Sequence, residues 1–161
     1  MKPRSAVVTK QYPRRKDADG NYLCAVCGKA LPNWHRKYCS RACADVAWVA
    51  CIPQHARLRV RQRDKGVCAR CGCDTEKVKR ILKHLSRFNY DGLGIIKREL
   101  GFTRYHLWEV HHRIAVSEGG GLCGLGNLET LCIPCHNAET AALRRKPKTE
   151  PAAPLFAKAT P

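Results

Sequence analysis

Residues 108–136, WEVHHRIAVSEGGGLCGLGNLETLCIPCH, set the order strand, loop, strand, helix in this chain. The pattern predicts strands over about 106–114 and 127–131 on either side of a glycine-rich loop, followed by a helix. Neighbouring side chains of a strand point to opposite faces, so the adjacent His111 and His112 do not simply grip one ion together. The two histidines therefore need different tasks.

Further helices are expected on the N-terminal side of this stretch, after a short ribbon at residues 22–31. They span 40–50 with Ser40 as N-cap, Pro53 to about Lys65, a segment capped by Thr75, and a short segment near 95–100 closed by Gly101. One apolar stripe at helical spacing is expected to face the core: Val78, Ile81, Leu82 and Leu85.

The chain is strongly basic, with 161 residues and a formal net charge of +17. Such an excess favours a polyanionic partner, and a merely solvated basic surface is the alternative. The hydrophobic content of 44% permits one compact domain or two small ones. Because we find neither a long apolar run nor a secretory signal, we expect no membrane partner and a cytoplasmic location, or a nuclear one if the source is eukaryotic.

Eleven cysteines in a chain expected to stay in a reducing compartment favour metal ligation over disulfides. Cys24-x-x-Cys27 followed by Cys39-x-x-x-Cys43 has the pairing of a four-thiolate zinc site. His35 lies between the two pairs and is the alternative ligand. A structural zinc would also add folding free energy to a small core.

A second set of pairs, Cys68-x-x-Cys71 and Cys132-x-x-Cys135, predicts a second structural zinc. This ion would close a long loop, and closing a long loop in principle stabilises a fold more than closing a short one. Cys73 follows Cys71 closely and is an alternative ligand. The thiols outside the two sets are expected to behave as small buried hydrophobes: Cys51, Cys73 and Cys123.

His136 follows Cys135 directly, so a zinc at Cys135 would aim His136 from the start of the last helix. The strand that carries His111 and His112 would then face this helix. A site with two imidazole ligands has open positions, which a catalytic metal needs and a structural one avoids. Waters and phosphate oxygens of a substrate would complete the shell.

Three segments, WEVHHRIAVSEGGG, GNLETLC and CIPCHNAET, resemble the HNH endonuclease motif, whose fold is the ββα-metal finger. The CxxC pairs are similar to those of its zinc-stapled, treble-clef-like subtype. CAVCGKALPNWHRKYCSRAC and the GVCARC that comes later resemble the arrangement in HNH modules of annealing-helicase-type proteins, and such fingers also precede phage and bacterial HNH proteins. The resemblance covers about residues 22–140.

The resemblance implies a role for each histidine of the motif. His112 would be the general base, and His111 and His136 would hold the metal. Asn127 would be the central asparagine that holds the loop and helps to orient the base. These roles are carried by matching positions in the motif.

The chain departs from the commoner HNH pattern directly after the base. Arg113 stands where an apolar residue is usual, and Ala115 stands where a proline is usual. Glu109 has a counterpart in the bacterial toxin nucleases and is a candidate to hold an arginine near the phosphate. A plain surface carboxylate is the alternative for Glu109.

The expected fold class is α+β, a small zinc-stabilised ββα-metal finger with a helical insert and an N-terminal zinc finger. The expected organisation is a basic flexible arm at 1–20, a four-cysteine zinc finger at 21–50, an HNH nuclease domain at 51–145 with its insert at 74–104, and a disordered tail at 146–161.

The implied activity is metal-dependent hydrolysis of DNA phosphodiester bonds, with two structural zincs and one catalytic divalent ion (Mg, Mn, Ni or Zn). A phage-packaging or DNA-repair protein is a candidate further partner, and nothing indicates an oligomeric state. The competing interpretations are a non-catalytic zinc module that binds nucleic acid or a partner protein, and a protein whose histidines hold only structural zinc. Candidate phosphate contacts are Arg57, Arg59, Arg61, Arg63, Arg113, Arg144 and Arg145.

Overall fold

The computed structural model describes residues 4–32, 36–88, 90–102 and 106–145. Helices and two separate two-stranded antiparallel sheets make up this part of the chain, which confirms the predicted α+β class. The chain divides into two compact units, Met1–Ala56 with Leu122–Leu125 and Arg57–Gly121 with Gly126–Pro161. His35 and the segment 146–161 lie outside the described residues.

The first unit is built around the first cysteine set. Its elements are α1 (Arg4–Gln11), β1 (Arg15–Lys16), β2 (Tyr22–Leu23) and α2 (Arg41–Cys51). The strands β1 and β2 pair antiparallel, and an isolated bridge joins Leu23 to Ala30. As predicted, Ser40 caps α2, because its hydroxyl accepts a hydrogen bond from the Cys43 amide at 3.2 Å.

The expected flexible arm at residues 1–20 differs from the structure, where α1 and β1 occupy half of this segment. Helix α1 packs against α2, and Val8 on α1 is buried. Burial of apolar surface gives this basic segment a reason to fold that its composition alone does not reveal.

The second unit contains the two strands, the last helix and most of the glycine-rich loop predicted over residues 108–136. Helix α3 (Pro53–Asp64) begins in the first unit and continues into the second. The remaining elements are α4 (Thr75–Leu85), α5 (Tyr90–Glu99), β3 (Trp108–His112), the single turns η1 (Val116–Glu118) and η2 (Leu125–Asn127), β4 (Leu128–Cys132) and α6 (Ile133–Arg145). No helix in the described ranges is long and apolar enough to cross a membrane.

Helix α4 begins one residue away from its expected cap. Asp74 is the N-cap, and its carboxylate accepts the Lys77 amide at 2.9 Å. A carboxylate is favoured here because it also interacts with the positive end of the helix dipole. Thr75 is the first helical residue and is buried, with its hydroxyl donating to the Gly66 carbonyl at 2.7 Å.

The core of the second unit lies where the insert helices meet the end of the β3–β4 ribbon. It consists of Cys68, Leu82, Phe102, Leu107, Leu131, Cys132 and Ile133, with Val78, Leu93, Cys73 and Cys135 packed against it. The stripe predicted on α4 is correct for Leu82 and Val78 and wrong for Ile81, which is 50% exposed. Ile81 lies on the edge of the stripe, and only the side of α4 that carries Val78 and Leu82 faces the core.

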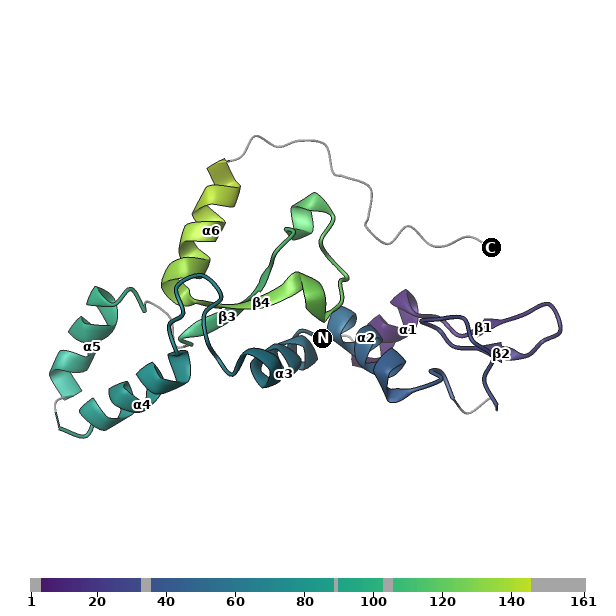
Figure 1. Ribbon diagram of the computed structural model, residues 1–161, viewed down its shortest axis with the longest axis horizontal. Coiled ribbons are helices and arrows are strands. Elements are labelled where there is room, and N and C mark those ends of the chain that lie inside the picture. The colour runs from purple at the N-terminus through teal and green to yellow at the C-terminus, as the bar shows by residue number, and fades with distance from the viewer. Residues whose placement is uncertain (1–3, 33–35, 89, 103–105, 146–161) are drawn as a thin grey trace. The chain divides into compact units, whose positions relative to one another are not determined.

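The β3–β4 ribbon and α6 follow the predicted order of strand, loop, strand and helix (Figure 1). The strands are antiparallel, with Trp108 opposite Cys132, His111 opposite Glu129 and His112 opposite Leu128. All five residues of β4 are buried, and α6 contacts both strands. The ribbon therefore forms the centre of the second unit.

Asp64, at the end of α3, anchors the middle of β4. Its Oδ2 accepts hydrogen bonds from the Thr130 amide at 3.0 Å and the Thr130 hydroxyl at 2.9 Å. Hydrogen bonding from Arg63 is the main cause that holds the pKa of Asp64 below its usual value, the Thr130 bonds lower it too, and burial opposes the shift. Thr130 is fully buried, so water cannot replace the carboxylate.

We expect Asp64→Ala to lower the free energy of unfolding by about 2–4 kcal/mol, because two buried donors lose their acceptor. The lowered pKa means that this stabilisation is present above the usual aspartate pKa and is lost as pH falls through the folded pKa. Urea titrations measure the free energy of unfolding of both proteins at pH 7 and in acid. The difference between variant and wild type should be smaller in acid than at pH 7. Asp19→Ala, at an exposed turn, is the control, and an equal loss in both variants would contradict the expectation.

Candidate functional site

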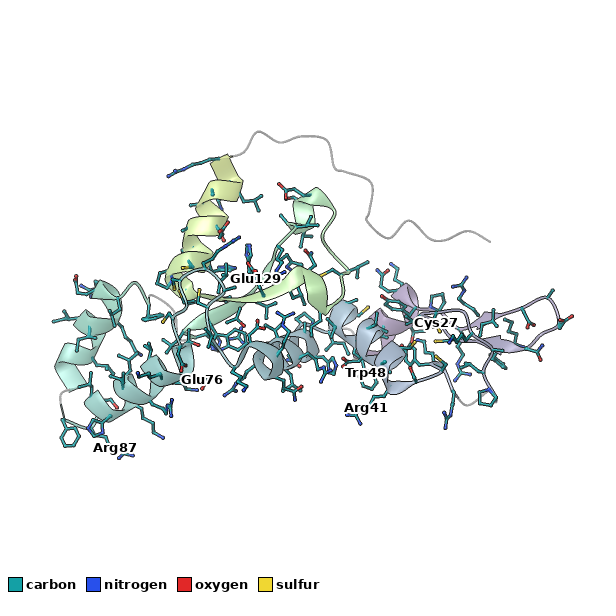
Figure 2. The ribbon with its side chains drawn as sticks, in the orientation of Figure 1. Cys27, Arg41, Trp48, Glu76, Arg87 and Glu129 are labelled. Atoms are coloured by element: carbon teal, nitrogen blue, oxygen red, sulfur yellow. The ribbon has the colours of Figure 1, made fainter. Side chains whose placement is uncertain are left out.

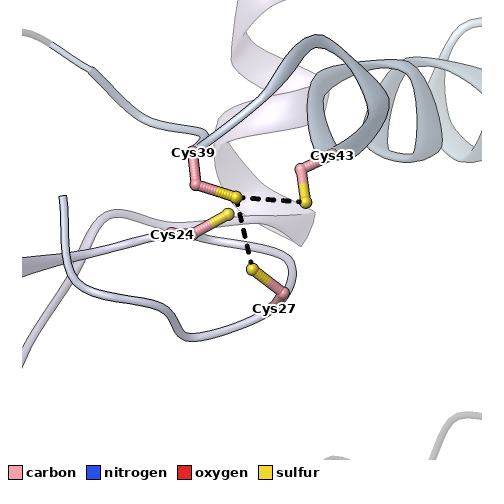
Figure 3. Close-up of side chains that lie close together, drawn as sticks. All are labelled: Cys24, Cys27, Cys39 and Cys43. Carbon is pink, nitrogen blue, oxygen red and sulfur yellow. Dashed lines mark hydrogen bonds between the residues drawn. The ribbon is translucent and has the colours of Figure 1, made fainter.

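The first cysteine set comes together in the first unit. Cys24 and Cys27 lie in the turn after β2, while Cys39 and Cys43 lie at the start of α2 (Figure 3). The four sulfurs all lie within 4.8 Å of one another, with Sγ–Sγ distances of 3.5 Å for Cys27–Cys39 and 3.6 Å for Cys39–Cys43. A tetrahedral zinc with Zn–S bonds of about 2.3 Å would separate its sulfurs by about 3.8 Å. The set therefore fits a zinc ion.

The second cysteine set joins segments that are far apart in the sequence. Its sulfurs, from Cys68, Cys71, Cys132 and Cys135, also lie within 4.8 Å of one another, and Cys71 and Cys132 are 3.6 Å apart. The Ala69 amide donates to the Thr130 carbonyl at 2.8 Å and aligns the two segments. This set too could hold a zinc.

Backbone amides donate to sulfurs of both sets. Burial alone would raise the pKa of Cys24, but hydrogen bonds from backbone amides, including those of Cys27 and Cys39, lower it to about 6. In the same way, hydrogen bonds from amides that include those of Cys132 and Cys71 outweigh burial and lower the pKa of Cys68 to about 7. Amide donors stabilise thiolates, the form of cysteine that binds metal.

The adjacent histidines of β3 lie on opposite faces of the ribbon, and His136 lies in the first turn of α6. The ring centroids of His111 and His136 are 5.8 Å apart, and their planes are nearly perpendicular at 86°. Burial lowers the pKa values of both His111 and His112 below the usual value. Their uncharged form is the one that binds a metal or accepts a proton. The structure thus brings together the two predicted metal ligands.

Asn127 fastens the loop that follows β3. Its Oδ1 accepts from the Ile114 amide at 2.8 Å, and its Nδ2 donates to the carbonyls of Ile114 at 3.1 Å and Gly120 at 2.9 Å. The Asn127 carbonyl also accepts from the Arg113 amide at 2.9 Å. One side chain therefore fixes both ends of the loop between Arg113 and Gly120.

The loop has little freedom at two further positions. Ala115, which replaces the usual proline, has φ −62° and ψ 152°, and this φ is close to the value that proline imposes. The departure therefore leaves the turn in a proline-compatible conformation. At Gly120, a Cβ atom would lie 1.8 Å from the Ile114 carbonyl oxygen and 2.9 Å from Asn127 Nδ2, so only glycine fits.

Two of the predicted phosphate contacts on α3 hold the ribbon. Arg57 donates to the Glu109 carboxylate and the Trp108 carbonyl, both at 2.9 Å, and its guanidinium lies 3.9 Å from the centre of the Trp108 ring. Glu109 thus pairs with an arginine, as the first of its two alternatives requires, and that arginine holds the ribbon. Arg63 donates to Asp64 at 2.6 Å and to the Leu128 carbonyl at 2.6 Å.

All of the remaining predicted cations except the half-buried Arg59 are exposed. Arg59 donates to Gln62 at 2.9 Å, and Arg61 pairs with Glu76 at 3.1 Å. Arg113 is 58% exposed at its side chain and pairs with Glu129 at 2.9 Å. The last two lie in the final turn of α6: Arg144 and Arg145.

A group of charges beside His111 was missed by the sequence analysis. Glu129, labelled in Figure 2, is 5% exposed and lies opposite His111 in the ribbon. It pairs with Arg113, and Arg70 lies 3.8 Å from it and 2.9 Å from Glu139 on α6. The antiparallel register of the two predicted strands is the signal that could have found Glu129.

Residues 98–142 match the family model of the HNH endonucleases. The mouse (Mus musculus) protein named DNA annealing helicase and endonuclease ZRANB3 is 30% identical over 157 residues, covering 83% of this chain and 14% of that protein. The cattle (Bos taurus) protein of that name is 30% identical over 159 residues, covering 84% and 15%, and the human (Homo sapiens) protein is 29% identical over 156 residues, covering 83% and 14%.

The chain spans only 14–15% of the length of these relatives. No solved structure matches it. The family match covers the β3–β4 ribbon, its loop and most of α6. These are the segments that resemble the HNH endonuclease motif in the sequence.

Proposed function

We propose that this chain, which carries an HNH endonuclease domain over residues 98–142, hydrolyses phosphodiester bonds of DNA by nicking or cleavage. The observation that carries the proposal is the arrangement of three histidines, with His111 and His136 side by side and His112 on the opposite face of β3. The relatives named as endonucleases are consistent with it.

His111 and His136 would hold one divalent ion, because their rings are close and both side chains are only half-buried. When bound, such an ion supplies charge stabilisation to the scissile phosphate and to the departing oxygen. The open positions that two imidazoles leave would admit substrate oxygens and water. Mg²⁺, Mn²⁺, Ni²⁺ and Zn²⁺ are the candidate ions.

His112 would act as the general base. Burial lowers its pKa, so its imidazole is uncharged at neutral pH and can accept a proton from water. The Asn127 hydrogen bonds that hold the following loop at Ile114 and Gly120 limit how far the end of β3 can move. Asn127 would in this way help to orient the base.

The two cysteine sets would hold structural zinc. The set that includes Cys132 and Cys135 lies at the junction of β4 and α6, immediately before His136. A zinc bound there would fix the direction in which α6 leaves the ribbon. The first set would stabilise a separate finger, in the proposed organisation of a finger at 21–50 and a nuclease domain at 51–145.

DNA binding would draw on the large positive charge of the chain. Arg57 and Arg63 are better suited to holding the ribbon than to meeting phosphates, since each already contacts groups of the ribbon. The cations that remain as phosphate contacts are the half-buried Arg59 and the exposed Arg61, Arg113, Arg144 and Arg145. The proposed location is where DNA is found, the nucleus in a eukaryote and the cytoplasm in a prokaryote.

A supercoiled-plasmid assay tests this proposal. The zinc-loaded chain is incubated with plasmid in the absence of added metal and with each of the four candidate ions. We expect the open-circular form to accumulate with at least one ion, with 5′-phosphate and 3′-hydroxyl ends. A chain that binds the plasmid and nicks it with none of the four ions would be a non-catalytic nucleic-acid-binding module.

A further inference from the structure

Helix α4 carries a basic stripe on the side that faces away from the core. Arg80, Lys83, His84 and Arg87 follow the spacing i, i+3, i+4 and i+7, which places them on one face of the helix and its last turn. All four are exposed. The core residues Val78 and Leu82 occupy the opposite side.

This stripe lacks the carboxylates that pair with Arg57, Arg61, Arg63, Arg70 and Arg113 in the second unit. Residues 77–88 contain no aspartate or glutamate. In the described part of the chain no carboxylate forms an ion pair with Arg80, Lys83 or Arg87, whereas Arg61 pairs with Glu76 and Arg113 with Glu129. Uncompensated cations along one helix face are complementary to a polyanion.

An aromatic side chain stands at the end of the stripe. Phe88 is 76% exposed, the highest value among the exposed large hydrophobic residues of the described chain. Its ring lies 5.0 Å from the ring of His84, with the planes tilted by 55°. The Phe88 amide donates to the Leu85 carbonyl at 3.0 Å, which fixes the turn that presents the ring.

We propose that this surface binds single-stranded DNA, with Phe88 stacking on an unpaired base and the cations of the stripe contacting the adjoining phosphates. Aromatic rings next to cations are the usual means of binding single strands without sequence readout. The face of a base is available for stacking only where the base is unpaired, so this surface favours a single strand over a duplex. Arg87, labelled in Figure 2, marks the end of α4 where the proposed contact lies.

The proposal goes beyond hydrolysis, because the stripe shares no residue with the proposed histidine site. It assigns a task to the insert, namely to hold an unpaired segment of a DNA substrate. Branched or gapped DNA contains such segments beside duplex.

Fluorescence anisotropy with the full-length His112→Ala chain tests the proposal independently of cleavage. The ligands are a labelled oligothymidylate of about 20 nucleotides, a duplex of equal length and an oligouridylate. In this background we expect Phe88→Ala to weaken oligothymidylate binding about tenfold, since stacking is worth about 1–3 kcal/mol per base, and to change duplex binding by less than about twofold. Phe88→Trp should restore binding, because it restores an aromatic face.

Neutralising the stripe gives a second readout. Replacing Arg80, Lys83 and Arg87 together by glutamine should flatten the salt dependence of oligothymidylate binding by about 2 in the log–log slope, because each lost phosphate contact on a single strand removes about 0.7. Ile95→Ala is the matched control for Phe88→Ala, since it also truncates an exposed apolar side chain, on the neighbouring helix α5.

Three results would overturn the proposal. The first is unchanged oligothymidylate binding by Phe88→Ala, and the second is an equal loss for the duplex or in Ile95→Ala. The third is tighter binding of oligouridylate than of oligothymidylate by the parent chain, which would exclude DNA as the preferred strand. Each of these results is a change in DNA or RNA binding. The test therefore works whether or not the chain has the proposed nuclease activity.

Discussion

His112→Ala is expected to slow metal-dependent nicking of a supercoiled plasmid by about 10²- to 10⁴-fold, the range that a positioned general base contributes. The variant removes the only group assigned to accept the proton of the attacking water. It leaves His111 and His136, the proposed metal ligands, in place. Single-turnover nicking rates, measured with the ion that best supports the wild type, give the size of the loss.

Two controls separate this loss from damage to the fold. The variant should retain the zinc content of the wild type, and His106→Ala, which changes an exposed histidine shortly before β3, should nick at close to the normal rate. Equal rates for His112→Ala and wild type under all four ions would rule out the assigned base. A similar loss in His106→Ala would point to a structural effect.

Cys132→Ser is expected to abolish cooperative unfolding of the second unit. Cys132 is 3% exposed and belongs both to the core and to the second cysteine set. Structural zinc contributes about 10–16 kcal/mol in zinc-finger peptides, whereas whole domains are stable by about 5–15 kcal/mol, so a small core cannot replace the ion. Elemental analysis should find one zinc per chain instead of two, and circular dichroism should lose one thermal transition.

Cys73→Ser is the matched control, because Cys73 packs against the same core beside the second cysteine set without belonging to it. It should keep both zincs and both transitions. Retention of two zincs by Cys132→Ser would contradict the assignment of Cys132 as a ligand. Loss of one zinc by Cys73→Ser would show that Cys73, the alternative to Cys71, is a ligand.

Features that depend on short sequence spacing could be predicted. The cysteine pairs came together as expected because a two- or three-residue spacer already places two sulfurs on one side of a turn. The β3–β4 ribbon followed from the glycine-rich loop between two apolar runs. Ser40 was correct as a cap because its partner, the Cys43 amide, is three residues away.

The distant partners of single arginines, and the extent of the core, could not be predicted. Arg57 and Arg63 look like solvated cations in the sequence, but their partners in the ribbon lie 51 and 65 residues away. Ile81 follows the apolar periodicity, yet its exposure depends on how far the core extends around α4. Periodicity indicates which face of a helix is apolar and does not give the width of the surface that covers it.

Two neighbouring glycines of the loop, Gly120 and Gly121, differ in how well they tolerate mutation. At Gly121 an added Cβ would meet only the Val116 side chain, at 3.3 Å, which can adjust. At Gly120 it would meet a backbone oxygen at 1.8 Å, and all other amino acids carry a Cβ. Every missense mutation at codon 120 is therefore disruptive, whereas codon 121 can drift toward alanine or serine.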